Sequence, residues 1–237
     1  MTRPGLLVVG WMTIATTVPA ADAQVAQKPP ANLPKLAESL NLTDGGVWRW
    51  LDRLGVNGDS RSERLLALES TGKILIERHG DDSSVRVDPE LDSLLLRPGA
   101  AVVLIHNHPA SVGLSLADLR HVYKPGVAAM VAIGHDGSVF IASAGPRFDH
   151  SGAADLHYPV AMAEIRDRLR REWPSGRLSI AASDAHTSHL ITLALARARI
   201  VQYWFKLRGG SLTSYQGTQF TFNRIAALGA ARLKTER

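Results

Sequence analysis

The chain has 237 residues, of which 45% are hydrophobic and 21% are charged, and it contains no cysteine. This composition is that of a globular protein and excludes a purely solvated tail or a fibre. The absence of cysteine excludes disulfides, thiol catalysis and Cys-ligated metal centres, so any metal ion must be held by nitrogen and oxygen atoms. The net charge of +5 is unevenly spread, because residues 1–150 carry 14 Lys/Arg against 16 Asp/Glu and residues 151–237 carry 13 against 6. The basic character therefore belongs to the C-terminal third.

The N-terminus has the pattern of a targeting segment. Arg3 precedes an uncharged, mostly apolar run over residues 5–18, and Ala21-Asp22-Ala23 offers a small-residue cleavage site before Gln24. The pattern predicts a secretory signal peptide over residues 1–23, with a buried N-terminal helix or a misplaced start as the alternatives. A run of 14 apolar residues is shorter than a membrane-spanning helix needs, so no stable membrane anchor is expected. We expect a periplasmic or secreted protein if the signal is genuine and a cytoplasmic one otherwise.

Residues 24–60 are expected to form a linker followed by short helices. Prolines at positions 29, 30 and 34 exclude a regular helix in the first part of this segment. Apolar residues then recur at near-helical spacing from Lys35 to Leu54, interrupted by Asp44-Gly45-Gly46. Two short helices are therefore predicted to lead into the main domain.

The main domain is expected over residues 61–147. Two short apolar runs, at 64–68 and 73–77, flank a turn at 70–72 and predict a β-hairpin. Asp88-Pro89 is a helix start, because Asp is a good N-cap and proline fits the first helical position. The domain therefore begins with a hairpin and a helix.

A buried strand, a helix and two further strands are expected next. The run from Ala100 to Ile105 is continuously apolar, as in strands that are covered on both faces. A helix is expected from Ser115, and two more strands are expected at 128–133 and 138–142, joined by an Asp-Gly turn. The order β-β-α-β-α-β-β predicts an α/β fold with a mixed β-sheet and flanking helices.

Two histidines follow the strand expected at 100–105. Because side chains alternate along an extended chain, His106 and His108 project from the same face and can bind one ion. Pro109 directs the chain away from the sheet, so the pair lies at a strand end. Ser115 opens a helix that carries Asp118 one turn in, where a carboxylate can supply an oxygen ligand. The pattern predicts a Zn²⁺ site with three protein ligands, which is the catalytic rather than the structural arrangement.

These residues resemble the metal motif of a known family. His106-Asn107-His108-Pro109 and Ser115-Leu116-Ala117-Asp118 match the H-x-H-P and S-x-x-D motifs of the JAMM/MPN (JAB) zinc metallopeptidases, and Asn107 is typical of the RadC-like branch. The resemblance spans residues 61–144. It implies a JAB/MPN-like, cytidine-deaminase-like fold and an enzyme that hydrolyses peptide or isopeptide bonds. The interval from His108 to Ser115 is one residue shorter than is usual in the family. We expect the turn at Gly113 to absorb the difference.

The resemblance also implies a role for each residue. His106, His108 and Asp118 would bind the zinc ion, and Ser115 would steady the tetrahedral oxyanion. A glutamate just ahead of the first core strand is the general base and acid in the family, and Glu63 matches that place. Glu69, at the hairpin turn, and Glu77, at the end of the returning strand, are the alternatives for the base.

The same residues also have structural interpretations. Ser115 and Asp118 fit a helix capping box, and the three glutamates could be solvated carboxylates at strand ends. His121 lies three residues after Asp118 on the same helix face and could be a further ligand or a solvated helix residue. A histidine pair followed by proline and S-x-x-D is an unusual combination, which favours the metal site.

The C-terminal residues 148–237 are expected to form a basic helical module. Residues 158–173 show helical periodicity with arginines largely off the apolar stripe, and residues 188–207 form a second, more apolar segment. A solvated basic face on helices that cover the sheet is favoured over a dedicated anion-binding surface. Aromatic residues do not interleave with the arginine cluster, so base stacking is not indicated.

Two functions from different classes are therefore considered. The first is a zinc-dependent hydrolase that acts on a protein or peptide substrate. The second is a non-catalytic, RadC-like binding module associated with nucleic acid. The ligand set and the base candidate favour the enzyme, whereas Asn107 and the basic C-terminal third favour the module. A secretory signal would count against a role on chromosomal DNA.

Overall fold

The structure is a computed structural model that describes residues 32–43, 45–56, 62–82, 84–146, 152–176 and 178–235. The expected signal peptide over residues 1–23 lies outside these ranges, as do residues 24–31 of the linker and the expected domain boundary at 147–148. Among the helices that are described, none is long and apolar enough to cross a membrane.

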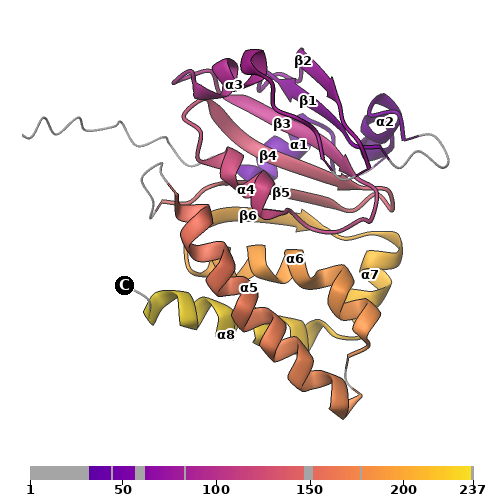
Figure 1. Cartoon of the computed structure of the whole chain (residues 1–237). Helices are drawn as coiled ribbons and strands as arrows, with labels where there is room; N and C mark the ends of the chain where they lie inside the picture. Colours follow the sequence, from indigo (N-terminus) through magenta and orange to yellow (C-terminus); the bar gives the residue numbers. More distant parts are fainter. Residues whose placement is uncertain are drawn as a thin grey trace, which may run out of the picture.

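A six-stranded mixed sheet forms the centre of the fold (Figure 1). Its strand order is β2-β1-β3-β4-β5-β6, and β3 and β4 run parallel while the other neighbours run antiparallel. The strands are β1 Arg64–Leu68, β2 Ile74–His79, β3 Val102–His108, β4 Val127–Gly134, β5 Val139–Ala144 and β6 Val201–Lys206. The α/β class with a mixed sheet and flanking helices, predicted from the sequence, is confirmed.

Helices cover both faces of the sheet. Two short helices pack on one face, against a core that includes Leu66, Val103 and Ile105: α1 Leu33–Ser39 and α2 Gly46–Arg53. The opposite face packs against a larger core that continues into the C-terminal helices. The helices on that side are α3 Pro89–Leu96, α4 Leu116–Val122, α5 Ala153–Glu172, α6 Ile180–Arg197, α7 Gly209–Gln216 and α8 Gln219–Thr235, with a 3₁₀ turn at Trp173–Ser175.

The predicted hairpin and helix starts are confirmed. β1 and β2 pair antiparallel, and the side chain of Asp88 accepts the Leu91 N–H at the start of α3. The central strand extends beyond its predicted end. β3 begins at Val102 and continues through His108 with every residue buried, so both histidines lie inside the strand rather than after it.

The C-terminal third differs from the expectation of an all-helical segment over residues 188–207. α6 ends at Arg197, Arg199 adopts a positive φ of 64°, and β6 then pairs antiparallel with β5. The sequence of β6, Val-Gln-Tyr-Trp-Phe-Lys, is rich in aromatic and β-branched residues, which suit an edge strand of a half-buried sheet. The C-terminal third therefore contributes a strand to the sheet as well as the helices beside it (Figure 1).

Two contacts fix the C-terminal helices relative to the strand ends. Asp136, in the turn between β4 and β5, accepts the Ser211 N–H (3.0 Å) in the first turn of α7. Gly113, in the loop between β3 and α4, lies against the backbone of His189 on α6, where a Cβ on the glycine would be 2.7 Å from the His189 nitrogen. The loop can therefore approach α6 this closely only because residue 113 has no side chain.

Candidate metal centre

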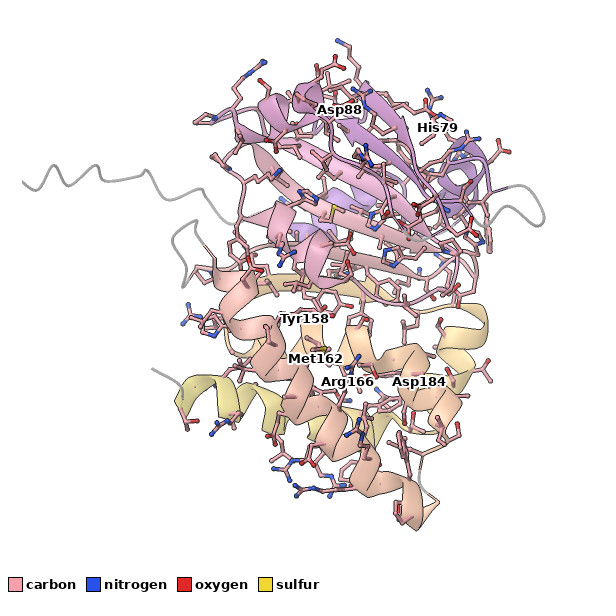
Figure 2. All side chains as sticks on the ribbon, viewed as in Figure 1. His79, Asp88, Tyr158, Met162, Arg166 and Asp184 are labelled. Carbon is pink, nitrogen blue, oxygen red and sulfur yellow. The ribbon has the colours of Figure 1, made fainter. Side chains whose placement is uncertain are left out.

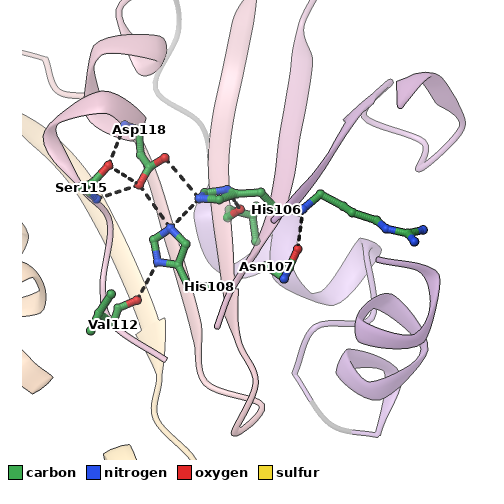
Figure 3. A network of polar contacts seen from close by, with 8 residues as sticks. His106, Asn107, His108, Val112, Ser115 and Asp118 are labelled. Atoms are coloured by element: carbon green, nitrogen blue, oxygen red, sulfur yellow. Dashed lines mark hydrogen bonds and ion pairs between the residues drawn. The ribbon is translucent and has the colours of Figure 1, made fainter. Parts of the chain in front are cut away.

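The two histidines of β3 converge on each other. Their rings are both buried, with 2% and 6% of their residue surfaces exposed, and their Nε2 atoms lie 2.7 Å apart. The Asp118 carboxylate on α4 faces the same point, with Oδ1 3.2 Å from His106 Nε2 and Oδ2 3.5 Å from His108 Nε2. Figure 3 shows this network from close by. The structure thus brings together the three residues that were predicted as ligands.

The outer nitrogen of each histidine is bound to a backbone carbonyl. His106 Nδ1 donates to the carbonyl of Val131 (3.0 Å), and His108 Nδ1 donates to the carbonyl of Val112 (2.9 Å). Because a carbonyl only accepts, both protons are placed on Nδ1 and both Nε2 atoms present lone pairs to each other. Two lone pairs at this distance require a proton or a metal ion between them. Histidine ligands of metal ions are oriented in this way, so the donor set fits a metal ion.

Asp118 is held by the start of its own helix. Ser115 donates from its backbone N–H (2.7 Å) and its hydroxyl (2.8 Å) to Asp118 Oδ2, and the Asp118 N–H donates to the Ser115 hydroxyl oxygen (3.2 Å). This is the capping box that the S-x-x-D pattern predicted. The capping role and the ligand role are compatible, because Oδ1 faces His106 while Oδ2 takes the capping bonds.

The buried charges of the site depend on each other. Burial raises the pKa of Asp118, but His106 and His108 outweigh this effect and hold it well below its ordinary value. Burial lowers the pKa of His108, and the Asp118 carboxylate outweighs it, so the net pKa is raised. The site therefore favours negative charge on the aspartate and positive charge between the two imidazoles. A divalent cation would supply that positive charge.

Glu63 lies in the same cleft as the three ligands. A cleft of about 370 Å³ is lined by Glu63, the two histidines, Asp118 and Ser115. Burial raises the pKa of the Glu63 carboxyl above its ordinary value, while the nearby His108 and His106 oppose this rise. Glu63 does not belong to the convergent group of possible ligands, so it is placed beside the centre rather than in it.

The two alternative glutamates lie elsewhere. Glu69 is at the hairpin turn and pairs with Lys73 (3.6 Å), whereas Glu77 is on β2 and pairs with His79 (3.4 Å) and Arg64 (4.0 Å). Neither lines the cleft. The position of Glu63 is therefore the one that fits a proton-transfer group for this site.

His121 lines the cleft but does not join the ligand group. Among the residues that the structure describes, the only cluster of metal-ligating side chains is His106, His108 and Asp118. Burial lowers the pKa of His121 to about 4, and its Nδ1 has no hydrogen-bond partner. The ring is therefore neutral at pH 7 and more buried than the solvated helix residue that the sequence suggested.

Asn107 has a contact that the sequence did not reveal. Asn107 lies between the two histidines in sequence, so its fully buried side chain projects from the opposite face of β3. Its Oδ1 accepts the Arg64 N–H (2.7 Å), and its Nδ2 donates to the Ser62 carbonyl (3.0 Å). These two backbone groups flank Glu63 on either side. A further contact joins Nδ2 to His135 Nε2 (3.1 Å). Asn107 therefore fixes the backbone from which Glu63 projects into the cleft.

The shortened loop turns at a different residue from the one expected. Ser111, with a positive φ of 54°, donates its N–H to the His108 carbonyl (3.0 Å) and closes the turn after β3. Gly113 does not adopt a positive φ and instead allows the close approach to α6. The loop between them presents the Val112 carbonyl to His108. The shorter interval is thus compatible with an intact ligand set.

Comparisons with known proteins do not extend this description. Neither a scan against protein-family models nor searches of curated proteins and of solved structures found a match to the chain. A functional assignment therefore depends on the site geometry and on the motif resemblance.

Proposed function

We propose that the chain is a metal-dependent hydrolase of peptide or isopeptide bonds with a JAMM-type site. The observation that carries this proposal is the convergence of two buried Nε2 atoms and one buried carboxylate, with Glu63 in the same cleft. Zinc suits this set, because it accepts imidazole nitrogen and carboxylate oxygen in sites with three protein ligands. Zinc in such a site lowers the pKa of water to about 7 and polarises a carbonyl.

His106, His108 and Asp118 would hold the ion, and the carbonyls of Val131 and Val112 would keep both imidazoles in the Nδ1–H form. Glu63 would accept the proton of the attacking water and return it to the leaving amine. Asn107 keeps the Glu63 backbone in place during both transfers.

In this structure the Ser115 hydroxyl binds Asp118, which differs from the oxyanion contact that the family resemblance implies. Its hydroxyl proton is donated to Asp118 Oδ2, which fixes the carboxylate. Steadying a tetrahedral oxyanion, as the family resemblance implies, would require this hydroxyl to turn from Asp118 towards the substrate. The cleft position of Ser115 is compatible with that movement.

The test is hydrolysis of a broad panel of peptides and isopeptides by the zinc-loaded protein. Glu63→Gln should keep the metal and lose about 10²–10⁴ in rate, because the proton-transfer group is removed and no ligand is lost. Glu69→Gln and Glu77→Gln serve as matched controls and should stay active. An active Glu63→Gln variant together with an inactive control would show that the base is the glutamate replaced in that control and not Glu63.

The absence of hydrolysis by zinc-loaded wild type across the panel would favour the RadC-like binding module instead. The basic C-terminal third gives that alternative little support, because several of its arginines are paired within the chain. Examples are Arg168 with Glu164 (2.7 Å) and Arg171 with Asp167 (2.6 Å).

A further inference from the structure

A second groove adjoins the site, between α5 and α6. It has a volume of about 410 Å³, and its charged lining residues are Arg166 and Arg170 from α5 and Asp184 from α6. Figure 2 shows Tyr158, Met162 and Arg166 following one another along α5, with Asp184 beside Arg166. We call this feature the arginine groove.

The two arginines of the groove differ from the other arginines of α5. Arg168 and Arg171 each pair with an acidic residue one turn earlier on the helix. Arg166 and Arg170 are exposed, lie one turn apart on the same helix face, and form no ion pair with any residue that the structure describes. Two guanidinium groups thus face the groove with their donors available for an anion.

The arginine groove continues from the candidate metal centre. Ser188 on α6 lines both the cleft of the centre and the arginine groove. A chain bound across the metal centre can therefore pass Ser188 and reach the two arginines.

The charges of the groove select the kind of anion. Two arginines and one aspartate leave a surplus of one positive charge, which suits a single carboxylate rather than a long polyanion. A nucleic-acid backbone carries a phosphate at every step and requires a longer run of cations for stable binding. The indole N–H of Trp173, which also lines the groove, donates to the Ser183 hydroxyl (2.9 Å). That contact ties the indole to α6 rather than leaving it free for base stacking.

Resting on the hydrolase function proposed above, we propose that the arginine groove is a specificity subsite that binds an acidic residue of the peptide substrate. The carboxylate of that residue pairs with Arg166 and Arg170 while the scissile bond lies in the cleft. Asp184 limits the total negative charge that the groove accepts. The protein would therefore prefer peptides with one acidic residue beyond the scissile bond over neutral peptides of the same length.

The binding test uses fluorescein-labelled peptide pairs that differ only by Glu against Gln, titrated into the full-length, zinc-loaded Glu63→Gln variant. The acidic peptide should bind more tightly, and combined Arg166→Ala and Arg170→Ala should weaken it by about tenfold and remove the preference. Arg171→Ala is the control, because it removes one positive charge from the same helix but outside the groove, and it should keep the preference. Asp184→Asn should strengthen binding of peptides with two acidic residues.

Other outcomes would overturn the proposal. Equal affinities for the Glu and Gln peptides would show that the groove does not bind the carboxylate. The same conclusion would follow if Arg171→Ala weakened binding of the acidic peptide as much as the combined groove variant does. If a single-stranded oligonucleotide bound more tightly than the acidic peptide, and if this binding depended on Arg166 and Arg170, the groove would be assigned to nucleic acid. Charge-dependent peptide binding without hydrolysis by wild type would refute the proposed function and leave a peptide-binding groove, whereas hydrolysis without a charge preference would refute the groove alone.

Discussion

Among the residues that the structure describes, two pairs of buried histidines have different surroundings. The rings of His106 and His108 on β3 have centroids 4.5 Å apart and Nε2 atoms 2.7 Å apart, whereas the ring centroids of His186 and His189 on α6 are 6.2 Å apart. The first pair faces a buried carboxylate. The second pair packs among aromatic rings, with His189 4.4 Å from Phe205 by ring centroids.

The hydrogen bonds of the α6 pair also differ. His189 Nδ1 shares a hydrogen bond with the Tyr203 hydroxyl (2.9 Å), and His186 Nε2 shares one with the Ser214 hydroxyl (2.8 Å). Burial lowers the pKa of His189 to about 3, so it is neutral over the ordinary pH range. Burial alone therefore does not make a histidine a ligand. Convergent lone pairs and an opposing carboxylate distinguish the β3 pair.

Metal content gives the largest expected difference between the two pairs. His108→Ala should reduce bound zinc from about one ion per chain to near zero, because only two of the three ligands remain. His189→Gln, as the matched change in the other pair, should leave the zinc content at the wild-type value. Elemental analysis of the folded fractions measures both. Equal zinc in wild type and His108→Ala would refute the site.

Asn107 tests whether the β3 site depends on more than its ligands. Asn107→Ala removes both bonds to the backbone on either side of Glu63, so kcat should fall about 10–100-fold, as for loss of an outer contact that orients a site. Zinc content should stay at the wild-type value. Asn107→Asp keeps an acceptor for the Arg64 N–H and should lose less activity. Loss of zinc in Asn107→Ala would show that the residue supports the ligands rather than Glu63.

Stability against pH tests the other pair. In the unfolded chain His189 binds a proton below about pH 6.5, but in the folded chain burial prevents this until a pH of about 3. The unfolded state therefore binds more protons below pH 6.5, and the free energy of unfolding should fall by about 2 kcal/mol between pH 8 and pH 5 from this residue. The titratable groups that face His189 are His186, Tyr203 and Tyr215.

Denaturant unfolding at several pH values measures this slope. His189→Gln should flatten it. An unchanged slope in His189→Gln would assign the acid sensitivity to another group.

The smallest effect is expected from the cap that holds Asp118. Ser115→Ala should cost about 1 kcal/mol in the free energy of unfolding, because the capping box at α4 is lost. Ser179→Ala removes the corresponding cap of α6, where the hydroxyl accepts the Ala182 N–H (3.1 Å), and should cost a similar amount. Only Ser115→Ala should also weaken zinc binding, by about tenfold. Thermal unfolding measures the loss of stability in both variants, and a competitive zinc titration measures the loss of zinc affinity.

The sequence predicted the strands and helices between residues 64 and 144, because hydrophobic periodicity and turn residues agreed there. The strand β6 was missed because the chain leaves α6 through Arg199 at a positive φ, without glycine or proline to mark the break. The change from Ala- and Leu-rich sequence to Val, Tyr, Trp and Phe was the only local indication of a strand.

The ligand set was predictable because its residues lie within one strand, one loop and one helix start. The contacts that orient Glu63 were not, since Asn107 meets Arg64 and Ser62 across 43 and 45 residues of chain. Their pairing depends on the register between β1 and β3, and hydrophobic patterning alone does not specify this register between individual residues. The arginine groove likewise depends on how α5 and α6 pack.

The close approach of Gly113 to His189 limits how this protein can be divided. The loop that presents the Val112 carbonyl to His108 packs against the backbone of α6. Removal of the C-terminal helices would therefore leave that loop without this packing contact. A fragment that ends near residue 146 would keep every ligand but lack the surface that sets the imidazole orientation. Transplanting the motif to another scaffold would require this supporting helix as well as the strand and the helix that carry the ligands.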